Sequence, residues 1–224
     1  RNKASVSHRN LSKEGHRILT GIRGIYEMSK PKLLLATNNK AKVKEYTKLL
    51  HGIPYRIISL EDANIVEQVE ETGSSFEENA ALKARRYAEL SGLTTLADDS
   101  GLEVDALGGE PGVRSARYAG EGVSDKKRID FLLKKMTDIP WERRVAQFRC
   151  VIAIAFPDGS VKLCKGACNG ILTFAPLGDN GFGYDPIFYL PSLHKTMAEL
   201  SMNEKNAVSH RGKATKKARR LLLQ

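Results

Sequence analysis

The chain has 224 residues, of which 41% are hydrophobic and 28% charged, values that suit a globular protein of one large domain or two closely joined lobes. The sequence contains no run of about 18 apolar residues, which argues against a membrane-spanning helix. The formal net charge of +10 invites a nucleic-acid-binding interpretation. However, residues 1–28 hold six basic and two acidic side chains, and residues 213–220 hold five basic ones. Basic ends of this kind are typical of solvated faces or disordered arms, so we expect anionic small molecules, and no nucleic acid or membrane, as partners.

Residues 1–28 lack the long apolar segment of a secretory signal. We interpret them as an arm that is disordered or foreign to the fold, with a transit peptide as the alternative. Met28 reads as a natural beginning because a strand follows at once, so the folded domain is predicted to span residues 29–224. The three cysteines are interpreted as reduced thiols, because the C-x3-C pair at 164 and 168 has no further Cys or His at zinc-site spacing.

Strands and helices alternate along the first half of the chain. The apolar run 32–36 predicts a buried strand, and the apolar spacing within 42–50 predicts a helix. A second strand is expected at 55–60. A helix at 76–91 is indicated by Ser74 or Ser75 as its cap and by glutamates in its first turn.

Hairpins dominate the second half. The pattern predicts a strand at 93–97 that ends at Asp98, followed by an alternating stretch at 102–106. The further expectations are a helix at 125–136, paired strands at 146–156 and 161–165, a strand end at 188–189, and helices at 196–200 and 207–223. This order favours an α/β fold with a mixed central sheet and flanking helices.

Four segments can carry chemistry. The first lies between a predicted strand and a helix N-terminus, where backbone N–H groups and the helix dipole favour an anion. Its polar and basic side chains suit a triphosphate, although the glycines of a P-loop are absent; a polar turn with solvated lysines is the alternative. The segment comprises Thr37, Asn38, Asn39, Lys40, Ala41 and Lys42.

The second segment is Asp98-Asp99-Ser100. Adjacent carboxylates repel each other unless a cation neutralises them, and Mg²⁺ prefers a few carboxylates together with phosphate oxygens and water. Because neighbouring side chains of a strand point to opposite faces, only one aspartate need face a metal ion while the other orients a lysine or the backbone. Residues 69–73 supply candidate acidic partners, and a turn or helix cap is the alternative for 98–101.

The third segment is the loop 181–186, in which two glycines around an aromatic residue permit close backbone approach. Phe182 or Tyr184 can stack on a purine, and the backbone at Gly183 or the carboxylate of Asp185 can read its edge. A structural turn is the alternative.

The fourth segment is 205–212. Lys205 can pair with a phosphate, Arg211 can bond two acceptors at once, and His210 can donate to a base carbonyl. A surface pair of His210 and Arg211 is the alternative.

Together these segments resemble the inosine triphosphate pyrophosphatase family, the Ham1-like or RdgB-like dITP/XTP pyrophosphatases. The similarity extends from residue 32 to about residue 223. The motifs that carry it are T-x-N-x-x-K at Thr37, E-E-T-G at Glu70, F-x-E-N-A-x-x-K-A at Phe76, L-A-D-D-S-G-L at Leu96, P-G-x-x-S-A-R-Y at Pro111, G-F-G-Y-D-P-I-F at Gly181 and S-H-R-G at Ser209.

The resemblance implies cleavage between the α- and β-phosphates of ITP, dITP and XTP, with Mg²⁺, by a homodimer whose lobes surround a nucleotide-binding cleft. We expect the protein to be cytoplasmic. The resemblance assigns Asp99 as general base and metal ligand, and Glu70 as a second metal ligand. It assigns the phosphates and sugar to residues 37–42, Ser100 and Lys205, and the base to Phe182, Gly183, Tyr184, Asp185, His210 and Arg211.

Selectivity has a physical basis. Hypoxanthine and xanthine present a 6-oxo acceptor where adenine presents an amino donor, and facing donors leave buried groups unpaired at a cost of roughly 1–3 kcal/mol each. Two alternatives stay open: a Maf-like pyrophosphatase of similar fold acting on pyrimidine or modified nucleotides, and a nucleic-acid-binding module that uses the basic ends.

Overall fold

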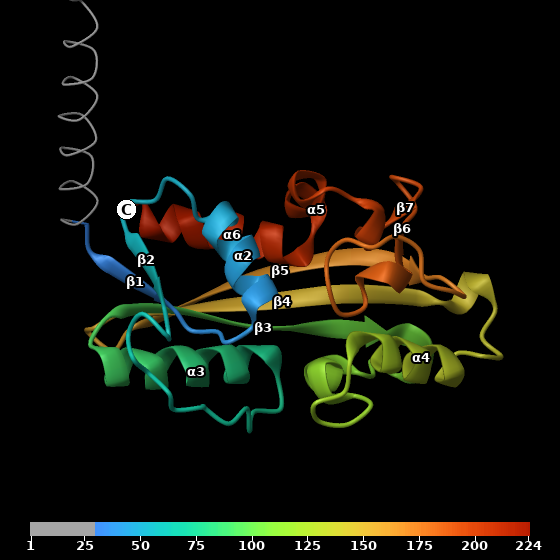
Figure 1. The fold of residues 1–224 in the computed structure, drawn as a ribbon, viewed down its shortest axis with the longest axis horizontal. Helices are drawn as coiled ribbons and strands as arrows, with labels where there is room; N and C mark the ends of the chain where they lie inside the picture. Colours follow the sequence, from blue (N-terminus) through green and yellow to red (C-terminus); the bar gives the residue numbers. More distant parts are fainter. Residues whose placement is uncertain (1–29) are drawn as a thin grey trace, which may run out of the picture.

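The computed structural model describes residues 30–224, so the arm predicted at 1–28 lies outside the described residues. Seven strands form one mixed sheet in the order β2-β1-β3-β4-β5-β6-β7 (Figure 1). β1 lies parallel to β2 and β3, and every later pair is antiparallel. The strands are β1 (Lys32–Leu35), β2 (Arg56–Ser59), β3 (Thr94–Val104), β4 (Val145–Ala155), β5 (Val161–Leu172), β6 (Phe188–Leu190) and β7 (Lys195–Thr196).

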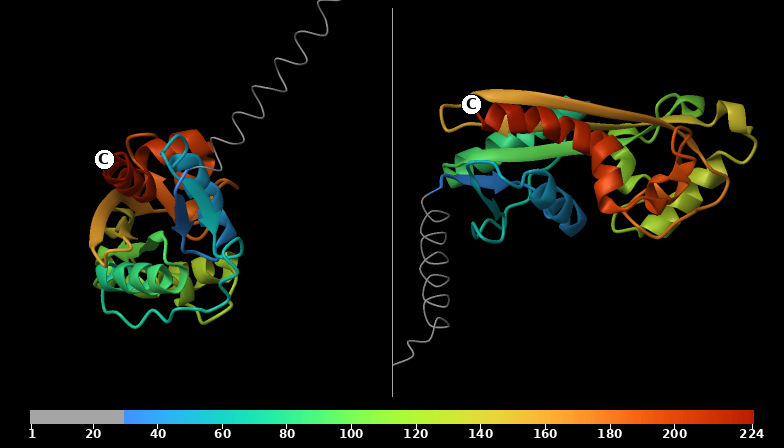
Figure 2. Two further views of the ribbon diagram at one scale, coloured as in Figure 1. Left: turned by 90° about the vertical axis from the view of Figure 1, so that its left-hand side faces the viewer. Right: turned by 90° about the horizontal axis from the view of Figure 1, so that it is seen from above.

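Helices cover both faces of the sheet, which confirms the predicted α/β class. One face is covered by α3 (Phe76–Ser91), and the opposite face by α2 (Lys40–Leu49) and α6 (His210–Leu222) (Figures 1 and 2). α4 (Asp125–Lys135) packs against the distal half of the sheet, by which we mean the C-terminal ends of β3 and β5 and the N-terminal end of β4. α5 (Met202–Val208) directly precedes α6. Short 3₁₀ turns lie at Asp105–Leu107, Gly112–Arg117, Trp141–Arg143, Asp185–Ile187 and Met197–Glu199. Among residues 30–224, no helix combines the length and apolarity that a membrane crossing requires.

The alternation of side chains along the strands divides the core. Leu33 and Leu35 of β1 pack in the cluster beneath α2 and α6, whereas Leu34 packs in the cluster against α3. A third cluster joins α4 to the distal parts of β3, β4 and β5. The same period of two on β3 decides which face receives each of the polar residues at 98–100.

The expected end of the strand at Asp98 is wrong, because β3 continues to Val104. β4 supplies an antiparallel partner along the whole segment and pairs Asp98 with Ile152 and Asp99 with Val151. Pairing with the buried residues of β4 through a complete hydrogen-bond ladder thus keeps the DDSG sequence extended, although its composition favours a turn.

The expected helices at 196–200 and 207–223 are also corrected. Residues 195–199 form β7 and a 3₁₀ turn, and the last helical region is two helices that meet at Ser209. Ser209 has an extended backbone (φ −68°, ψ 159°), and its side chain accepts a hydrogen bond from the Gly212 amide. Ser209 therefore ends α5 and caps α6, which fixes the direction of the following two side chains.

Candidate active site

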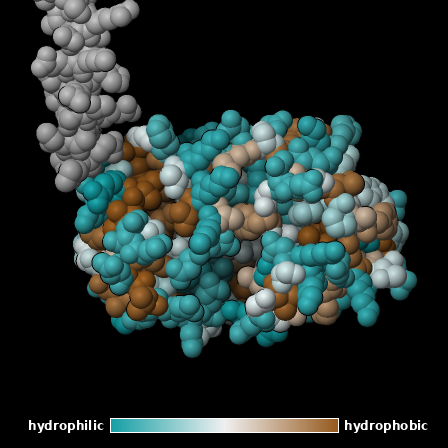
Figure 3. Space-filling view, viewed as in Figure 1, coloured by the Kyte–Doolittle hydropathy of each residue, from teal (hydrophilic) through white to brown (hydrophobic). Residues whose placement is uncertain are grey.

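A cleft of about 590 Å³ lies between the α2–α6 side and the α3–α4 side of the sheet. Its lining comes from the β1–α2 loop, Gln68, Val69 and Glu71, α3, β3, the turn at 112–117, α4, Phe148 of β4, the loop 182–185 and the start of α6. In the space-filling view, a hollow near the middle of the face is bordered mainly by hydrophilic residues (Figure 3). Segments that are far apart in sequence thus share one polar cavity, which agrees with the predicted arrangement of two lobes around a cleft.

The β1–α2 loop forms one wall. Asn39 caps α2, its side-chain oxygen accepting from the amides of Ala41 (2.9 Å) and Lys42 (3.1 Å). Thr37 accepts from the Asn39 amide at 3.2 Å, which fixes the loop before the cap. The positive end of α2 therefore faces the cleft, as expected for an anion site. Of the six residues predicted here, Lys40 alone is absent from the lining.

Asp98 and Asp99 point to opposite sides of β3, as the strand alternation predicts. Asp98 accepts from Lys42 Nζ at 2.9 Å and from Ser100 Oγ at 3.1 Å. Burial alone would raise the pKa of Asp98, but the positive charges of Lys42 and Arg211 hold this pKa well below its usual range. Asp98 is therefore a fixed anion that orients Lys42.

Asp99 lies on the α3 side and lines the cleft. It accepts from Asn79 Nδ2 at 3.0 Å and from the Ser100 amide at 3.0 Å. Burial raises the pKa of Asp99 to about 6, against the opposing charge of Lys83, whose Nζ lies 3.9 Å from Asp99 Oδ1. This carboxyl group thus changes its protonation state close to neutral pH.

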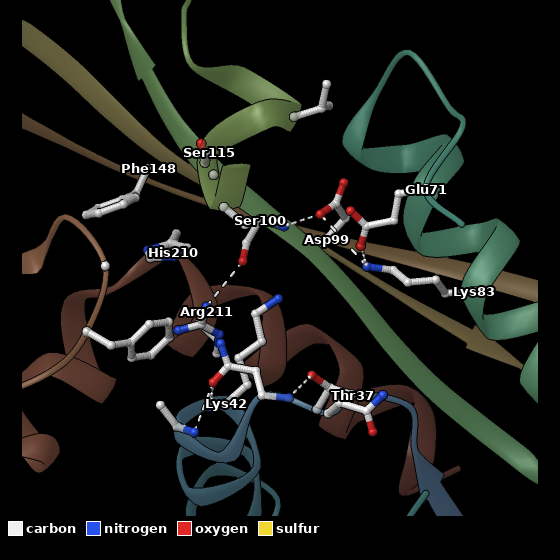
Figure 4. Close-up of a pocket in the computed structure, with 18 of the residues that line it drawn as sticks. Thr37, Lys42, Glu71, Lys83, Asp99, Ser100, Ser115, Phe148, His210 and Arg211 are labelled. Atoms are coloured by element: carbon white, nitrogen blue, oxygen red, sulfur yellow. Dashed lines mark hydrogen bonds and ion pairs between the residues drawn. The ribbon is translucent and has the colours of Figure 1, made fainter. Parts of the chain in front are cut away.

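Lys83 joins Asp99 to a second carboxylate (Figure 4). Its Nζ lies 2.5 Å from Glu71 Oε1. Burial would lower the pKa of Lys83, but the carboxylates of Asp99 and Glu71 raise it, so the side chain stays positively charged. Lys83 therefore supplies the positive charge that two neighbouring carboxylates require.

Residues 30–224 contain no group of three or more His, Cys, Asp or Glu side chains placed to hold a metal ion alone. The pair of Asp99 and Glu71 still fits Mg²⁺, which retains water and takes its remaining ligands from substrate phosphates. Glu70, the predicted second ligand, is exposed and lies outside the lining, whereas Glu71 lines the cleft.

The distal end of the cleft is formed by the loop 182–185 and the start of α6. His210 stacks on Phe148, with ring centroids 4.6 Å apart and planes at 17°. Burial, followed by the charge of Arg211, lowers the pKa of His210 well below its ordinary value, so the imidazole is neutral at pH 7. Both His210 Nδ1 and Arg211 Nε are buried without a hydrogen-bond partner among the described residues.

A buried ion-pair network supports this end. Glu45 of α2 lies 2.6 Å from Lys205 Nζ and 2.5 Å from an Arg211 nitrogen, and Lys205 also contacts Asp185 at 2.6 Å. Lys205 is therefore a buried structural cation that does not line the cleft, and its predicted phosphate contact has no geometric basis here. The Phe182 ring lies over both cations, 4.8 Å from Lys205 Nζ and 5.1 Å from the guanidinium carbon of Arg211.

Sequence reasoning gave no role to Lys83 and Phe148, and it did not single out Glu71 within the candidate acidic segment 69–73, although all three line the cleft. Lys83 stands four residues after Asn79 on α3, and this spacing puts both on one helix face above Asp99. That signal was present in the sequence, whereas nothing local distinguishes Glu71 from Glu70. The three cysteines, interpreted above as reduced thiols, are free and buried.

Groups that favour phosphate and groups that favour a divalent cation share this cleft, which places the chain in the class of α/β proteins that handle phosphate compounds. The model of the Ham1 family matches residues 33–221, and the chain belongs to that family. The resemblance seen in the motifs is thereby confirmed.

Named relatives are similar over most of their length. The chain is 50% identical to the dITP/XTP pyrophosphatase of Desulforamulus reducens, over 85% of this chain and 95% of that protein. It is also 50% identical to the enzyme of the same name from Halalkalibacterium halodurans, over 82% and 94%. Among solved structures, the Ham1 protein of Coxiella burnetii has a TM-score of 0.79 and 43% identity, covering 86% of this chain and 98% of that one. The Staphylococcus aureus Ham1 protein has a TM-score of 0.77 and 45% identity, covering 85% and 97%.

Proposed function

We propose that the chain hydrolyses non-standard purine nucleoside triphosphates (ITP, dITP and XTP) to the monophosphate and pyrophosphate, which removes them from the nucleotide pool. The observation that carries this proposal is the Asp99–Lys83–Glu71 group across the cleft from the N-terminus of α2. The names of the relatives, dITP/XTP pyrophosphatase, support the substrate class.

We propose Mg²⁺ as the cofactor, held by Asp99 and Glu71. A bound magnesium ion supplies charge neutralisation at the phosphate oxygens. Asp99 would accept a proton from the attacking water as the general base, the role that the family resemblance implies, from its place on the cleft wall beside Lys83. Lys83 adds positive charge beside the departing pyrophosphate. The Thr37–Lys42 loop and the α2 dipole hold the terminal phosphates.

Base selection is proposed for the distal end. Phe182 offers a ring for stacking, held by the two cations behind it. The unpartnered Arg211 Nε is a donor that a 6-oxo group can satisfy, whereas the amino group of adenine cannot. Asp185 lines the cleft, but its Oδ2 already accepts from the Phe182 amide at 2.9 Å, so we assign it to shaping the loop.

The test is turnover with ITP and Mg²⁺, with ATP as the comparison substrate and pyrophosphate as the measured product. We expect pyrophosphate release that is faster with ITP and is lost in Asp99→Asn, because the amide cannot accept the proton of water. Release of orthophosphate, or equal rates with ITP and ATP, would contradict the proposal. Preferential turnover of pyrimidine nucleotides would favour the Maf-like alternative.

We further propose a cytoplasmic homodimer as the working form, on the strength of the family resemblance. Sedimentation equilibrium of the purified chain tests the dimer directly. A single species of about 24.8 kDa would contradict it.

A further inference from the structure

The loop that carries Phe182 is fixed on its α5 side by internal contacts. We refer to residues 181–185 as the base loop. The Phe182 amide donates to Asp185 Oδ2 at 2.9 Å, and the same carboxylate oxygen lies 2.6 Å from Lys205 Nζ. The loop is thereby anchored to α5.

Two further contacts reach across to the opposite side of the cleft. Tyr184 donates its hydroxyl to the Ser115 carbonyl at 3.0 Å, at a buried position on the cleft floor. Gly183 donates its amide to Asp125 Oδ2 at 2.6 Å. Asp125 is the first residue of α4, follows the Ser124 cap and itself lines the cleft.

The Asp125 carboxylate is held in place by its own helix. Its second oxygen forms an ion pair with Arg128, one turn further along α4, and Arg128 also donates to the Ala116 carbonyl. One oxygen is therefore occupied by the arginine, and the other is directed at Gly183. Gly183 has a left-handed backbone (φ +64°), which side-chain-bearing residues rarely adopt. A charge-assisted bond thus fixes the amide immediately after Phe182.

We propose that Asp125 is a positioning residue for nucleobase recognition, which holds the base loop so that Phe182 presents its ring to the purine. This inference rests on the proposed function and adds a specificity-determining residue to it. Asp125 touches the base loop and acts through it, whereas Asp99 and Glu71 are joined to Lys83 on the α3 side. Its loss is therefore expected to weaken substrate binding more than it slows the chemical step.

The test compares Asp125→Ala with Asp125→Asn, which keeps an acceptor oxygen, and with Asp130→Ala, which removes an exposed charge from the same helix. We expect Asp125→Ala to raise KM for ITP by roughly tenfold, the scale of one hydrogen bond to a charged group. The change in kcat should be smaller than the change in KM. Asp125→Asn should recover most of the affinity, and Asp130→Ala should match the wild type.

A double-mutant cycle identifies the route of the effect. If Asp125 acts through Phe182, adding Asp125→Ala to Phe182→Ala should raise KM little beyond Phe182→Ala alone. Additive increases in KM, or equal KM values for the Ala and Asn variants at position 125, would overturn the proposal.

Amide hydrogen exchange supplies a readout that does not need turnover. The Gly183 amide should exchange faster in Asp125→Ala than in the wild type, and should be unaffected by Asp130→Ala. Unchanged exchange at Gly183, or faster exchange with unchanged KM, would refute the positioning role. A wild-type protein that fails to release pyrophosphate from ITP would instead refute the proposed function, and exchange would still decide whether Asp125 fixes the loop.

Discussion

Asp98 and Asp99 are adjacent on β3, yet their carboxyl groups differ in their pKa and in their role. Asp98 meets the cations of the α2–α6 side and stays ionised, whereas Asp99 meets α3 and has a pKa of about 6. The period of two in a strand predicted this division from the sequence. The second acid was harder to predict, because the segment 69–73 lies outside any helix or strand, so no period tells which glutamate faces inward.

The choice between Glu70 and Glu71 is directly testable. We expect Glu71→Gln to raise the Mg²⁺ concentration needed for half-maximal turnover by roughly 10- to 100-fold, the range known for groups that support a metal site. Glu70→Gln should change it by less than about twofold, because an exposed charge contributes little. Magnesium titrations of pyrophosphate release provide the measurement. A larger effect at Glu70 would restore the assignment made from the family resemblance.

His210 gives a prediction for stability against pH. Its folded-state pKa lies below the unfolded value because of burial and the charges of Arg211 and Lys205, so the unfolded chain binds the proton more tightly. Stability from this group is present above the unfolded pKa and is lost as pH falls below about 6.5, by at most about 1.4 kcal/mol per pH unit.

The variant His210→Gln does not titrate and should lack this component. Denaturant unfolding of both proteins between pH 7 and pH 5.5 would give the two slopes of unfolding free energy against pH. Parallel slopes would contradict the lowered pKa of His210 in the folded state.

At the scale of elements, the long strands and helices follow from local patterns, but their ends depend on neighbours. The helix at 76–91 is confirmed to the residue, because Ser75 caps it and Gly92 ends it in a left-handed conformation. β5 runs to Leu172, well beyond the expected 165, because β4 offers an equally long partner. Nothing in the local sequence at 166–172 predicts that pairing.

The contact of α6 with β5 yields a prediction for Gly166. A Cβ at this position would collide with the backbone of His210 and Ala214, and backbone atoms cannot move as a side chain does. We expect Gly166→Ala to lower the free energy of unfolding by about 1–3 kcal/mol. Because the displaced turn carries His210 and Arg211, KM for ITP should rise as well.

Lys162→Ala, an exposed change on the same strand, is the matched control and should leave both quantities near the wild-type values. Chemical denaturation and steady-state kinetics measure the two effects. Wild-type KM in a destabilised Gly166→Ala protein would show that the α6–β5 contact does not set the geometry of the base end.

At the scale of the whole molecule, the site is assembled from segments that only the fold brings together. Glu45 and Lys205 are 160 residues apart in the sequence and 2.6 Å apart in space. The sequence could indicate that each motif is polar and suited to binding or catalysis. It could not show that Lys205 forms buried ion pairs with Glu45 and Asp185. Burial of one charge depends on where all the others lie.

The distribution of charge over the chain leads to the last prediction. Residues 1–28 contribute +4 (six basic minus two acidic) to the net charge of +10. Yet, among the residues that the structure describes, those lining the cleft run from Ala36 to Arg211, and the family model begins at residue 33. A chain that begins at Met28 should therefore keep kcat/KM for ITP within about twofold of the full chain, because it retains the whole family domain and every lining residue that the structure describes.

The same pair of proteins separates the enzyme from the nucleic-acid-binding alternative. Binding through basic ends would appear as DNA or RNA affinity that falls steeply with salt and weakens when residues 1–27 are removed. For an enzyme of nucleoside triphosphates, truncation should change any such affinity while leaving the turnover of ITP intact. Loss of turnover on truncation would instead make the arm part of the catalytic domain, and the boundary predicted at residue 29 would have to move.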